Sequence, residues 1–218
     1  MVLLSPSIGG LKKLLSVCEA YAEEHGLIYN SRKSELLVFE APKQQPRSVP
    51  PVSLNGVALK IVSCFKYLGH VVTSVLRDDG DIERERRALS VRSNMLVRRF
   101  ARCTNSVKVT LFKAFCQSFY TSGLWVSYTR RAYGVLRVQF NNAFRMLLGL
   151  PWRCSASGMF AEARTDDFHA IMRKKAASLL RHLHGSDNSI LTMIAARPDC
   201  PLQRHWVATV INNTNIRL

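Results

Sequence analysis

The chain has 218 residues, 47% hydrophobic side chains and a mean hydropathy of −0.01, which excludes a disordered tail and predicts one or two packed cores. Its 31 basic and 15 acidic residues give a net charge of +16, which favours an anionic partner. A run of about 18 apolar residues and an N-terminal leader pattern are both absent. We therefore expect no membrane span, no secretion and an intracellular protein, cytoplasmic or nuclear.

Residues 1–75 predict a β-rich region with one helix. Val2–Leu4 followed by Ser5-Pro6-Ser7 is typical of the exit end of a buried strand. Apolar residues at helical spacing predict a helix over 8–25, which Gly26 ends. The segments GLIYN (26–30) and ELLVFE (35–40) favour two strand segments, or one strand interrupted by a turn.

The next segments predict a loop and two further strand units. The Pro-rich stretch 41–51 can extend neither a helix nor a sheet, so we expect a surface loop. The Asn55-Gly56 pair between apolar flanks predicts a hairpin over 52–62. The segment 64–73, CFKYLGHVVT, predicts a strand that Gly69 interrupts.

From residue 76 the pattern becomes helical. Residues 77–103 predict one long helix whose N-terminus carries Asp79 and Asp81, where carboxylates suit the helix dipole. One face of this helix is apolar, and we expect the opposite face to be a solvent-facing stripe of guanidinium groups. The apolar face holds Ile82, Leu89, Leu96 and Phe100, and the basic face holds Arg84, Arg87, Arg98 and Arg102.

Four more helices are predicted at about 106–121, 132–148, 166–185 and 188–197. The fold class is therefore α+β, with a β-rich part over 1–75, a helical part over 76–150 and a helical extension over 151–218. Residues 76–150 carry fourteen basic and five acidic residues, a net charge of +9, and no acidic residue lies between Glu85 and Glu162. Such a one-signed segment favours nucleic acid as the partner, with an anionic membrane or a ribonucleoprotein second.

The six cysteines are scattered and form no C-x-x-C pair, which favours reduced thiols over a disulfide framework or a zinc ribbon. A metal cluster is the less favoured interpretation of one group of residues, because its spacing fits no standard zinc finger and helix-surface histidines explain it. That group is His182, His184, Cys200 and His205.

Five motifs in one order resemble the reverse transcriptases of LINE-type (non-LTR) retrotransposons. They are VLLS, HGLIYNSRKSELLVF, FKYLGHVVT, DIERERRALSVRSNMLVRRF and NNAFRMLLGLP-RCSASGMF, and the resemblance covers about residues 2–160. It implies the C-terminal part of a right-hand polymerase palm, with short antiparallel strands and one helix, followed by a helical thumb and a helical extension. It also implies RNA and DNA, as template and primer, for partners; the oligomeric state stays open.

In this family, VLLS follows the metal-binding Asp-Asp box, so the resemblance implies that the catalytic carboxylates lie upstream of Met1. Polymerisation by two Mg²⁺ ions is expected of the intact enzyme, whereas this chain is expected to hold no metal or other cofactor and no retained catalytic residue. The Asp-Asp pairs of this sequence, Asp78/Asp79 and Asp166/Asp167, fit helix N-caps better than a metal site.

By resemblance, Lys33 approaches the phosphates of the incoming nucleotide and could assist proton transfer, while an exposed turn lysine is the alternative. Residues 65–69, which are Phe65, Lys66, Tyr67, Leu68 and Gly69, correspond to the primer grip. The alternative for them is an ordinary hairpin with Phe65 and Leu68 in the core. The four arginines of the basic stripe correspond to a thumb helix on the template–primer backbone, and a solvated helix face is the alternative.

Aromatic residues interleaved with arginines at 120–133 could stack bases, but core packing is favoured, above all for Trp125.

Three functional hypotheses follow. The chain is a retrotransposon polymerase fragment that contacts template–primer without polymerising, or a nucleic-acid-binding module derived from such an element. The third hypothesis is a non-functional partial gene product with exposed apolar surfaces.

Overall fold

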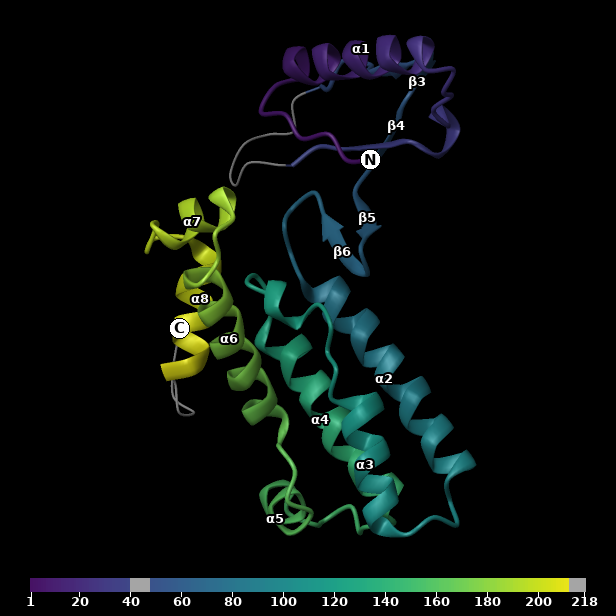
Figure 1. Ribbon diagram of the computed structural model, residues 1–218. Coiled ribbons are helices and arrows are strands. Elements are labelled where there is room, and N and C mark those ends of the chain that lie inside the picture. Colours follow the sequence, from purple (N-terminus) through teal and green to yellow (C-terminus); the bar gives the residue numbers. More distant parts are fainter. Residues whose placement is uncertain (40–47, 212–218) are drawn as a thin grey trace. The chain divides into compact units, whose positions relative to one another are not determined.

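A computed structural model describes residues 1–39 and 48–211, which form two compact units (Figure 1). Unit 1 comprises Met1–Lys66 and Val72–Leu76, and unit 2 comprises Tyr67–Val71 and the chain from Arg77 onward. Unit 1 holds α1 and most of the short strands, and unit 2 holds the remaining helices. The chain is therefore a mixed α+β protein, as its sequence predicts.

Unit 1 begins with helix α1 (Ile8–Glu24), which starts at Ser7, whose side chain accepts a hydrogen bond from the Gly10 N–H. Only one side of α1 packs, because Leu15 is buried whereas Leu14 and Tyr21 are exposed. The predicted strand at Val2–Leu4 is wrong: these residues form no strand in the structure. Instead, the half-buried Leu3 packs against the small core around Leu15.

Two strand pairs lie in unit 1. Strands β2 (Ser53–Leu54) and β3 (Val57–Ala58) form the predicted hairpin, and its turn residues Asn55 and Gly56 have φ of 51° and 73°. Strand β1 (Glu35–Leu37) pairs with β4 (Lys60–Val62) in a parallel sense. The expectation of antiparallel strands throughout is therefore wrong, since the long connection between these two strands allows a parallel arrangement.

The predicted strand at 26–30 is also wrong. Residues after Gly26 are irregular and enter a 3₁₀ helix, η1 (Ser31–Lys33), in which the Asn30 side chain accepts from the Lys33 N–H at 3.1 Å. This local hydrogen bond competes with a sheet ladder and explains why the backbone turns here. The predicted Pro-rich loop lies largely outside the described residues.

Strands β5 (Cys64–Tyr67) and β6 (His70–Thr73) form a hairpin with a two-residue turn. Its turn residues Leu68 and Gly69 have φ of 46° and 88°, so the predicted interruption at Gly69 is confirmed as a turn. A positive φ is ordinary for glycine and strained for leucine. The tip of this hairpin belongs to unit 2, although most of β5 belongs to unit 1.

Unit 2 is helical, and four of the five predicted helices agree closely in position, while α3 ends several residues earlier than expected. Two helices were not predicted: α5, and α8, which begins at Pro201, a residue that suits the first helical position. The helical elements are α2 (Asp79–Arg99), α3 (Asn105–Cys116), η2 (Ser122–Leu124), α4 (Arg130–Leu148), α5 (Ala156–Glu162), α6 (Phe168–His184), α7 (Ser189–Ala195) and α8 (Pro201–Ile211).

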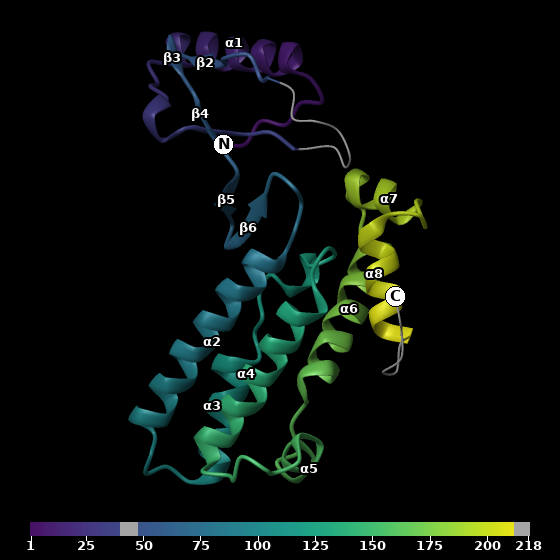
Figure 2. The same ribbon diagram turned by 180° about the vertical axis from the view of Figure 1, so that it is seen from behind.

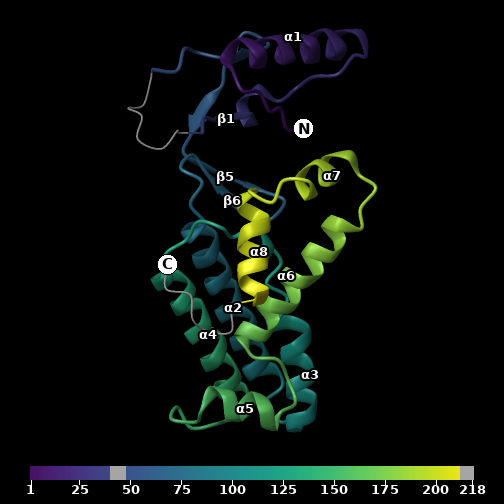
Figure 3. The same ribbon diagram turned by 90° about the vertical axis from the view of Figure 1, so that its left-hand side faces the viewer.

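The main core of unit 2 lies where α2, α3 and α4 pack together, as Figures 2 and 3 show from two further sides. Leu89 and Leu96 of α2 are fully buried there, which confirms the predicted apolar face. A smaller cluster around Ala176, Leu183 and Trp206 joins α6 to α8. Among the helices of the described residues, none is long and apolar enough to cross a membrane.

Candidate nucleic-acid interface

The carboxylate of Asp81, in the first turn of α2, is completely buried and surrounded by donors. Burial alone would raise the pKa of Asp81, but the hydrogen bonds to its ionised form outweigh burial and lower the pKa to about 2. Arg84 lies on α2 itself, and the other donors come from distant parts of the sequence, so the carboxylate joins them to α2. The donors are Val71 N–H at 3.0 Å, Arg84 Nε at 2.7 Å, Thr121 Oγ1 at 2.6 Å and Trp125 Nε1 at 2.7 Å.

The Asp81 carboxylate also fixes the turn of the β5–β6 hairpin within unit 2. His70 Nδ1 lies 3.1 Å from Asp81 Oδ2, next to the bond from Val71. On the other side of the turn, a Cβ at Gly69 would lie 3.9 Å from the ring of Tyr120. Leu68 and Tyr120 remain 74% and 81% exposed, so the fixed turn presents apolar and aromatic surface to solvent.

Of the other residues that correspond to the primer grip, Tyr67 belongs to unit 2 and is exposed, whereas Phe65 and Lys66 lie in unit 1, as does Lys33. Phe65 is half-buried and Lys66 is exposed on β5. Lys33 is the exposed last residue of η1, in agreement with both interpretations of its role. Leu68 is not a core residue, so the alternative of a hairpin with both Phe65 and Leu68 in the core is wrong for Leu68.

Asp78 and Asp79 hold a loop instead of capping α2 with their side chains. Asp78 occupies the N-cap position but makes no side-chain bond to its helix; its Oδ2 accepts from the N–H groups of Val126 and Ser127, both at 2.8 Å. Asp79 Oδ1 accepts from the N–H and hydroxyl of Thr129. The predicted N-cap position is therefore confirmed for Asp78, but neither side chain of the pair caps the helix.

At the second Asp-Asp pair, the capping prediction is confirmed for one residue. Asp167 is the N-cap of α6, and its Oδ1 accepts from the Ala170 N–H at 2.6 Å. Asp166 instead pairs with the ammonium of Lys174 at 2.6 Å. Within the described residues, no group of three or more His, Cys, Asp or Glu side chains gathers closely enough to hold a metal ion. The alternative cluster of His182, His184, Cys200 and His205 is accordingly not brought together.

The predicted arginine stripe divides into two parts. Arg84 is only partly exposed, because it contacts Thr121 and its guanidinium pairs with Asp81 and with Glu85 at 3.4 Å. Arg87 is exposed, but it pairs with Glu83 at 2.8 Å. Arg98 is exposed in the last turn of α2, and Arg102 is exposed just beyond it. The stripe of unpaired guanidinium groups is therefore wrong for the first half of the helix.

One end of unit 2 collects unpaired cations. The last turns of α2 and α4 and the starts of α3 and α5 meet at this end, which is lowest in Figure 1. We call the exposed arginines there the basic end: Arg98, Arg99, Arg102 and Arg153. None of the four forms an ion pair with a carboxylate of the described residues, while the five carboxylates of residues 78–85 are all engaged by internal donors.

The aromatic residues at 120–133 mostly pack, as favoured from the sequence. Trp125 is 1% exposed, and the rings of Tyr128 and Tyr133 stack with centroids 5.1 Å apart. Sequence reasoning missed Trp152, which is 77% exposed beside the basic end. Its position directly after Leu150-Pro151, where a helix has just ended, was the available signal.

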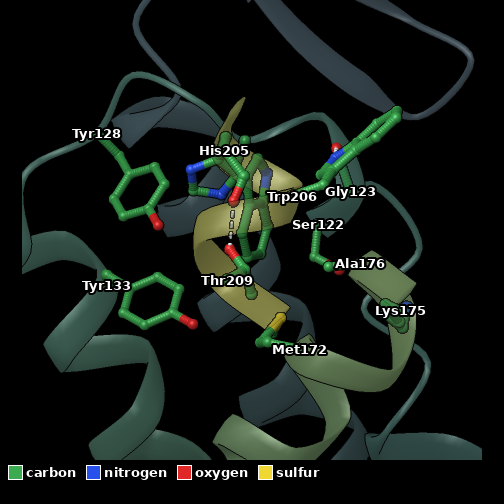
Figure 4. Close-up of a pocket in the computed structure, with 11 residues that line it drawn as sticks. Ser122, Gly123, Tyr128, Tyr133, Met172, Lys175, Ala176, His205, Trp206 and Thr209 are labelled. Atoms are coloured by element: carbon green, nitrogen blue, oxygen red, sulfur yellow. Dashed lines mark hydrogen bonds between the residues drawn. The ribbon is translucent and has the colours of Figure 1, made fainter. Parts of the chain in front are cut away.

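A small pocket lies between α4, α6 and α8, lined by Tyr128, Tyr133 and His205 among others (Figure 4). Burial lowers the pKa of His205 and raises the pKa of Tyr133, so both groups are neutral at neutral pH. Lys175, also in its wall, donates to the carbonyl oxygens of Ser118 and Phe119. With its one cation held by carbonyl groups, the pocket is suited to packing α8 and offers no charge to a phosphate.

Comparisons with known proteins add no relative: no family model matches the chain, and neither the curated proteins nor the solved structures contain a match to it.

Proposed function

We propose that this chain is part of a LINE-type reverse transcriptase and that unit 2 serves as its thumb, holding template–primer by the sugar-phosphate backbone. The motifs quoted above supply the family, and they begin after the family's metal-binding aspartates. We accordingly propose that the chain binds nucleic acid but does not polymerise on its own.

The observation that carries this proposal is the separation of charge along α2. The arginines of α2 up to Arg92 are paired with carboxylates: Arg84 with Asp81, Arg86 and Arg87 with Glu83, and Arg92 with Glu85. In its last turn, Arg98 and Arg99 are exposed and have no carboxylate partner among the described residues. Unpaired guanidinium groups on a rigid helix bind phosphates without regard to sequence, which is what a polymerase thumb requires.

The β5–β6 turn supports the same proposal. Leu68 keeps a strained left-handed backbone and an exposed apolar side chain, two local costs that persist where the surrounding structure enforces them. Here the enforcement comes from Asp81, which holds His70 and Val71. The resemblance assigns this turn to the primer grip, so we propose that it contacts the sugar-phosphate of the primer end.

A second candidate function is an independent nucleic-acid-binding module. One observation favours it: unit 2 has an extensive core of its own, with seventeen buried hydrophobic residues in one cluster, whereas the comparable cluster of unit 1 has three. Such a unit can remain folded whether or not a palm is present. Both candidate functions involve nucleic-acid binding. A polymerase thumb should prefer a duplex with a recessed 3′ end, whereas an independent binding module should show no such preference.

The test is a salt titration of binding to a recessed-end RNA–DNA duplex. We expect the triple variant Arg98→Ala/Arg99→Ala/Arg102→Ala to bind at least tenfold more weakly near 0.1 M salt, with the slope of log K against log salt reduced by about 2 to 3. The matched control is Arg181→Ala/Arg197→Ala/Arg204→Ala, which removes the same charge from exposed positions on other elements. Binding by the control should change by no more than about twofold.

Two outcomes would overturn the proposal. One is no detectable binding to RNA or DNA at low salt, and the other is equal loss in the two triple variants, which would mean that net charge alone is responsible. A primer-extension assay with Mg²⁺ or Mn²⁺ tests the proposal that the chain does not polymerise on its own. Incorporation above background by the purified chain would show that it polymerises and would contradict the assignment of catalysis to upstream motifs.

A further inference from the structure

Trp152 is the most exposed tryptophan of the chain and stands in a turn that the structure holds firmly. Helix α4 ends at Gly149, whose φ is 68°, and the Leu150 N–H returns to the Arg145 carbonyl at 2.9 Å. The Cys154 N–H then bonds to the Pro151 carbonyl at 3.0 Å, which closes a turn over residues 151–154. A single exposed apolar residue is ordinary, but here a rigid turn keeps it exposed.

Arg145 of α4 connects this turn to the helix by hydrogen bonds. Its Nε and Nη2 both donate to the Cys154 carbonyl, at 3.2 and 2.8 Å. Leu150 and Cys154, at the two sides of the turn, pack against the core of unit 2. The flanking residues therefore point inward and hold the backbone, while Trp152 and Arg153 project outward.

One face of the Trp152 ring is covered by a cation. The guanidinium carbon of Arg153 lies 4.8 Å from the ring centroid, within the range of a cation–π contact. Because Trp152 is still 77% exposed, the rest of the indole remains accessible. A flat group can stack on the open face while Arg153 supplies positive charge beside it.

The surroundings identify the chemistry of the flat group. Arg98, Arg99 and Arg102 belong to the same end of unit 2, and no acidic residue occurs between Glu85 and Glu162. An aromatic platform beside exposed arginines suits an unpaired nucleobase whose own backbone is anionic. A duplex offers no exposed base face along its length, so the flat group is an unpaired base.

We propose that Trp152 and Arg153 form a stacking site for an unpaired base of single-stranded RNA or DNA. This inference rests on the proposed nucleic-acid binding and names the form of nucleic acid that the basic end takes. Single-stranded template beyond the primer terminus would be its occupant in the intact enzyme. Stacking is indifferent to base identity, so we expect no sequence preference.

The test uses the intrinsic fluorescence of the chain and 12-mers of dT and rU. Trp125 and Trp206 are 1% and 8% exposed, so quenching by a bound base reports chiefly on Trp152. We expect quenching by both 12-mers, loss of quenching in Trp152→Phe, and weak quenching by a duplex long enough for its ends to be negligible. Trp152→Ala should bind the 12-mers about tenfold more weakly and the duplex within twofold of the parent chain.

Phe115→Ala is the matched control, because Phe115 is a 44% exposed aromatic near the far end of α3. It should bind both nucleic acids as the parent chain does. If salt-sensitive binding persists while Trp152→Ala is unaffected and quenching is absent, the stacking site is wrong and the backbone-binding proposal stands. If nothing binds at low salt, both proposals are wrong.

Discussion

The indole Nε1 of Trp125 donates to the Oδ2 of Asp81 at 2.7 Å, across 44 residues of sequence. Both groups are buried, so the bond joins the start of α2 to the segment that leads into α4. Through the same carboxylate, the tip of the β5–β6 hairpin is bound to both. The start of α2, the tip of the β5–β6 hairpin and the segment before α4 are therefore all joined by the carboxylate of Asp81.

Replacing that anion by a neutral amide should destabilise unit 2. Asp81→Asn retains the shape but turns one acceptor oxygen into a donor amid buried donors, so we expect a loss of about 2 to 4 kcal/mol in the free energy of unfolding. All three tryptophans lie in unit 2, so urea unfolding followed by tryptophan fluorescence reports this unit. Asp199→Asn, at an exposed position, is the control and should be neutral.

Acid should weaken unit 2 in a defined pH range. The pKa of Asp81 is lowered from 3.8 to about 2 in the folded chain, so its contribution is complete above pH 4 and disappears as pH falls from 4 towards 2. A carboxyl shifted to this extent contributes about 2 kcal/mol at neutral pH. Unfolding free energies at pH 5, 4, 3 and 2 should fall less steeply for Asp81→Asn than for the parent chain. Equal slopes would contradict the assignment.

Arg84 and Arg98 should separate stability from binding. Arg84→Ala removes one of the partners of the buried carboxylates of Asp81 and Glu85, so we expect a loss of about 1 to 3 kcal/mol in stability. Arg98→Ala removes an exposed group and should leave stability unchanged, while it lowers the salt slope of nucleic-acid binding by about 1. If Arg84→Ala left stability unchanged and weakened nucleic-acid binding more than Arg98→Ala does, the structure-based assignment would be wrong. The arginine stripe predicted from the sequence would then be right.

Relieving the strain at Leu68 should stabilise the hairpin. Asparagine tolerates a φ of 46° better than leucine, so Leu68→Asn should raise the free energy of unfolding by up to about 1 kcal/mol. Val91→Asn, which exchanges another exposed apolar residue on regular α2 backbone, should give no such gain. Hydrogen exchange of the Val71 amide provides a local readout, and faster exchange in Leu68→Asn would contradict the prediction.

The six thiols should differ in reactivity. Burial raises the pKa of Cys116 to about 11, and its side chain is fully buried, so it should stay unmodified until unit 2 unfolds. Cys64 is exposed and should be modified first by a thiol reagent at pH 7.5. Mass spectrometry of peptides after timed labelling gives the order directly. Early labelling of Cys116 would show that the core around Phe112 opens in the native state.

The helices could be predicted because their information is local. Ile82, Leu89 and Leu96 repeat at the helical period, and the structure buries all three. By contrast, the sequence pattern does not predict α8, although it begins at Pro201 and proline is favourable in a first turn. The parallel pairing of β1 with β4 was missed because strand direction depends on the route of the connecting chain, which local patterns do not encode.

The site residues show the same limit more sharply. A helical wheel places Arg84 on the face opposite Leu89, but it does not reveal that Thr121 contacts this arginine. The sequence identifies Asp81 only as a first-turn carboxylate, because its partners Val71 and Trp125 lie 10 and 44 residues away in sequence. Exposed groups such as Arg98 and Arg102 were placed correctly because solvent exposure needs no partner.

The separation of charge along α2 has a kinetic consequence. Because arginines balance the carboxylates near Asp79 while the guanidinium groups near Arg99 are unpaired, the side chains of α2 have an electric moment along the helix axis. In the field of a polyanion, this moment exerts a torque that turns the basic end forward before contact. Collisions would thus be orientation-biased, and association should become slower as added salt screens the field, even where the final contacts are the same.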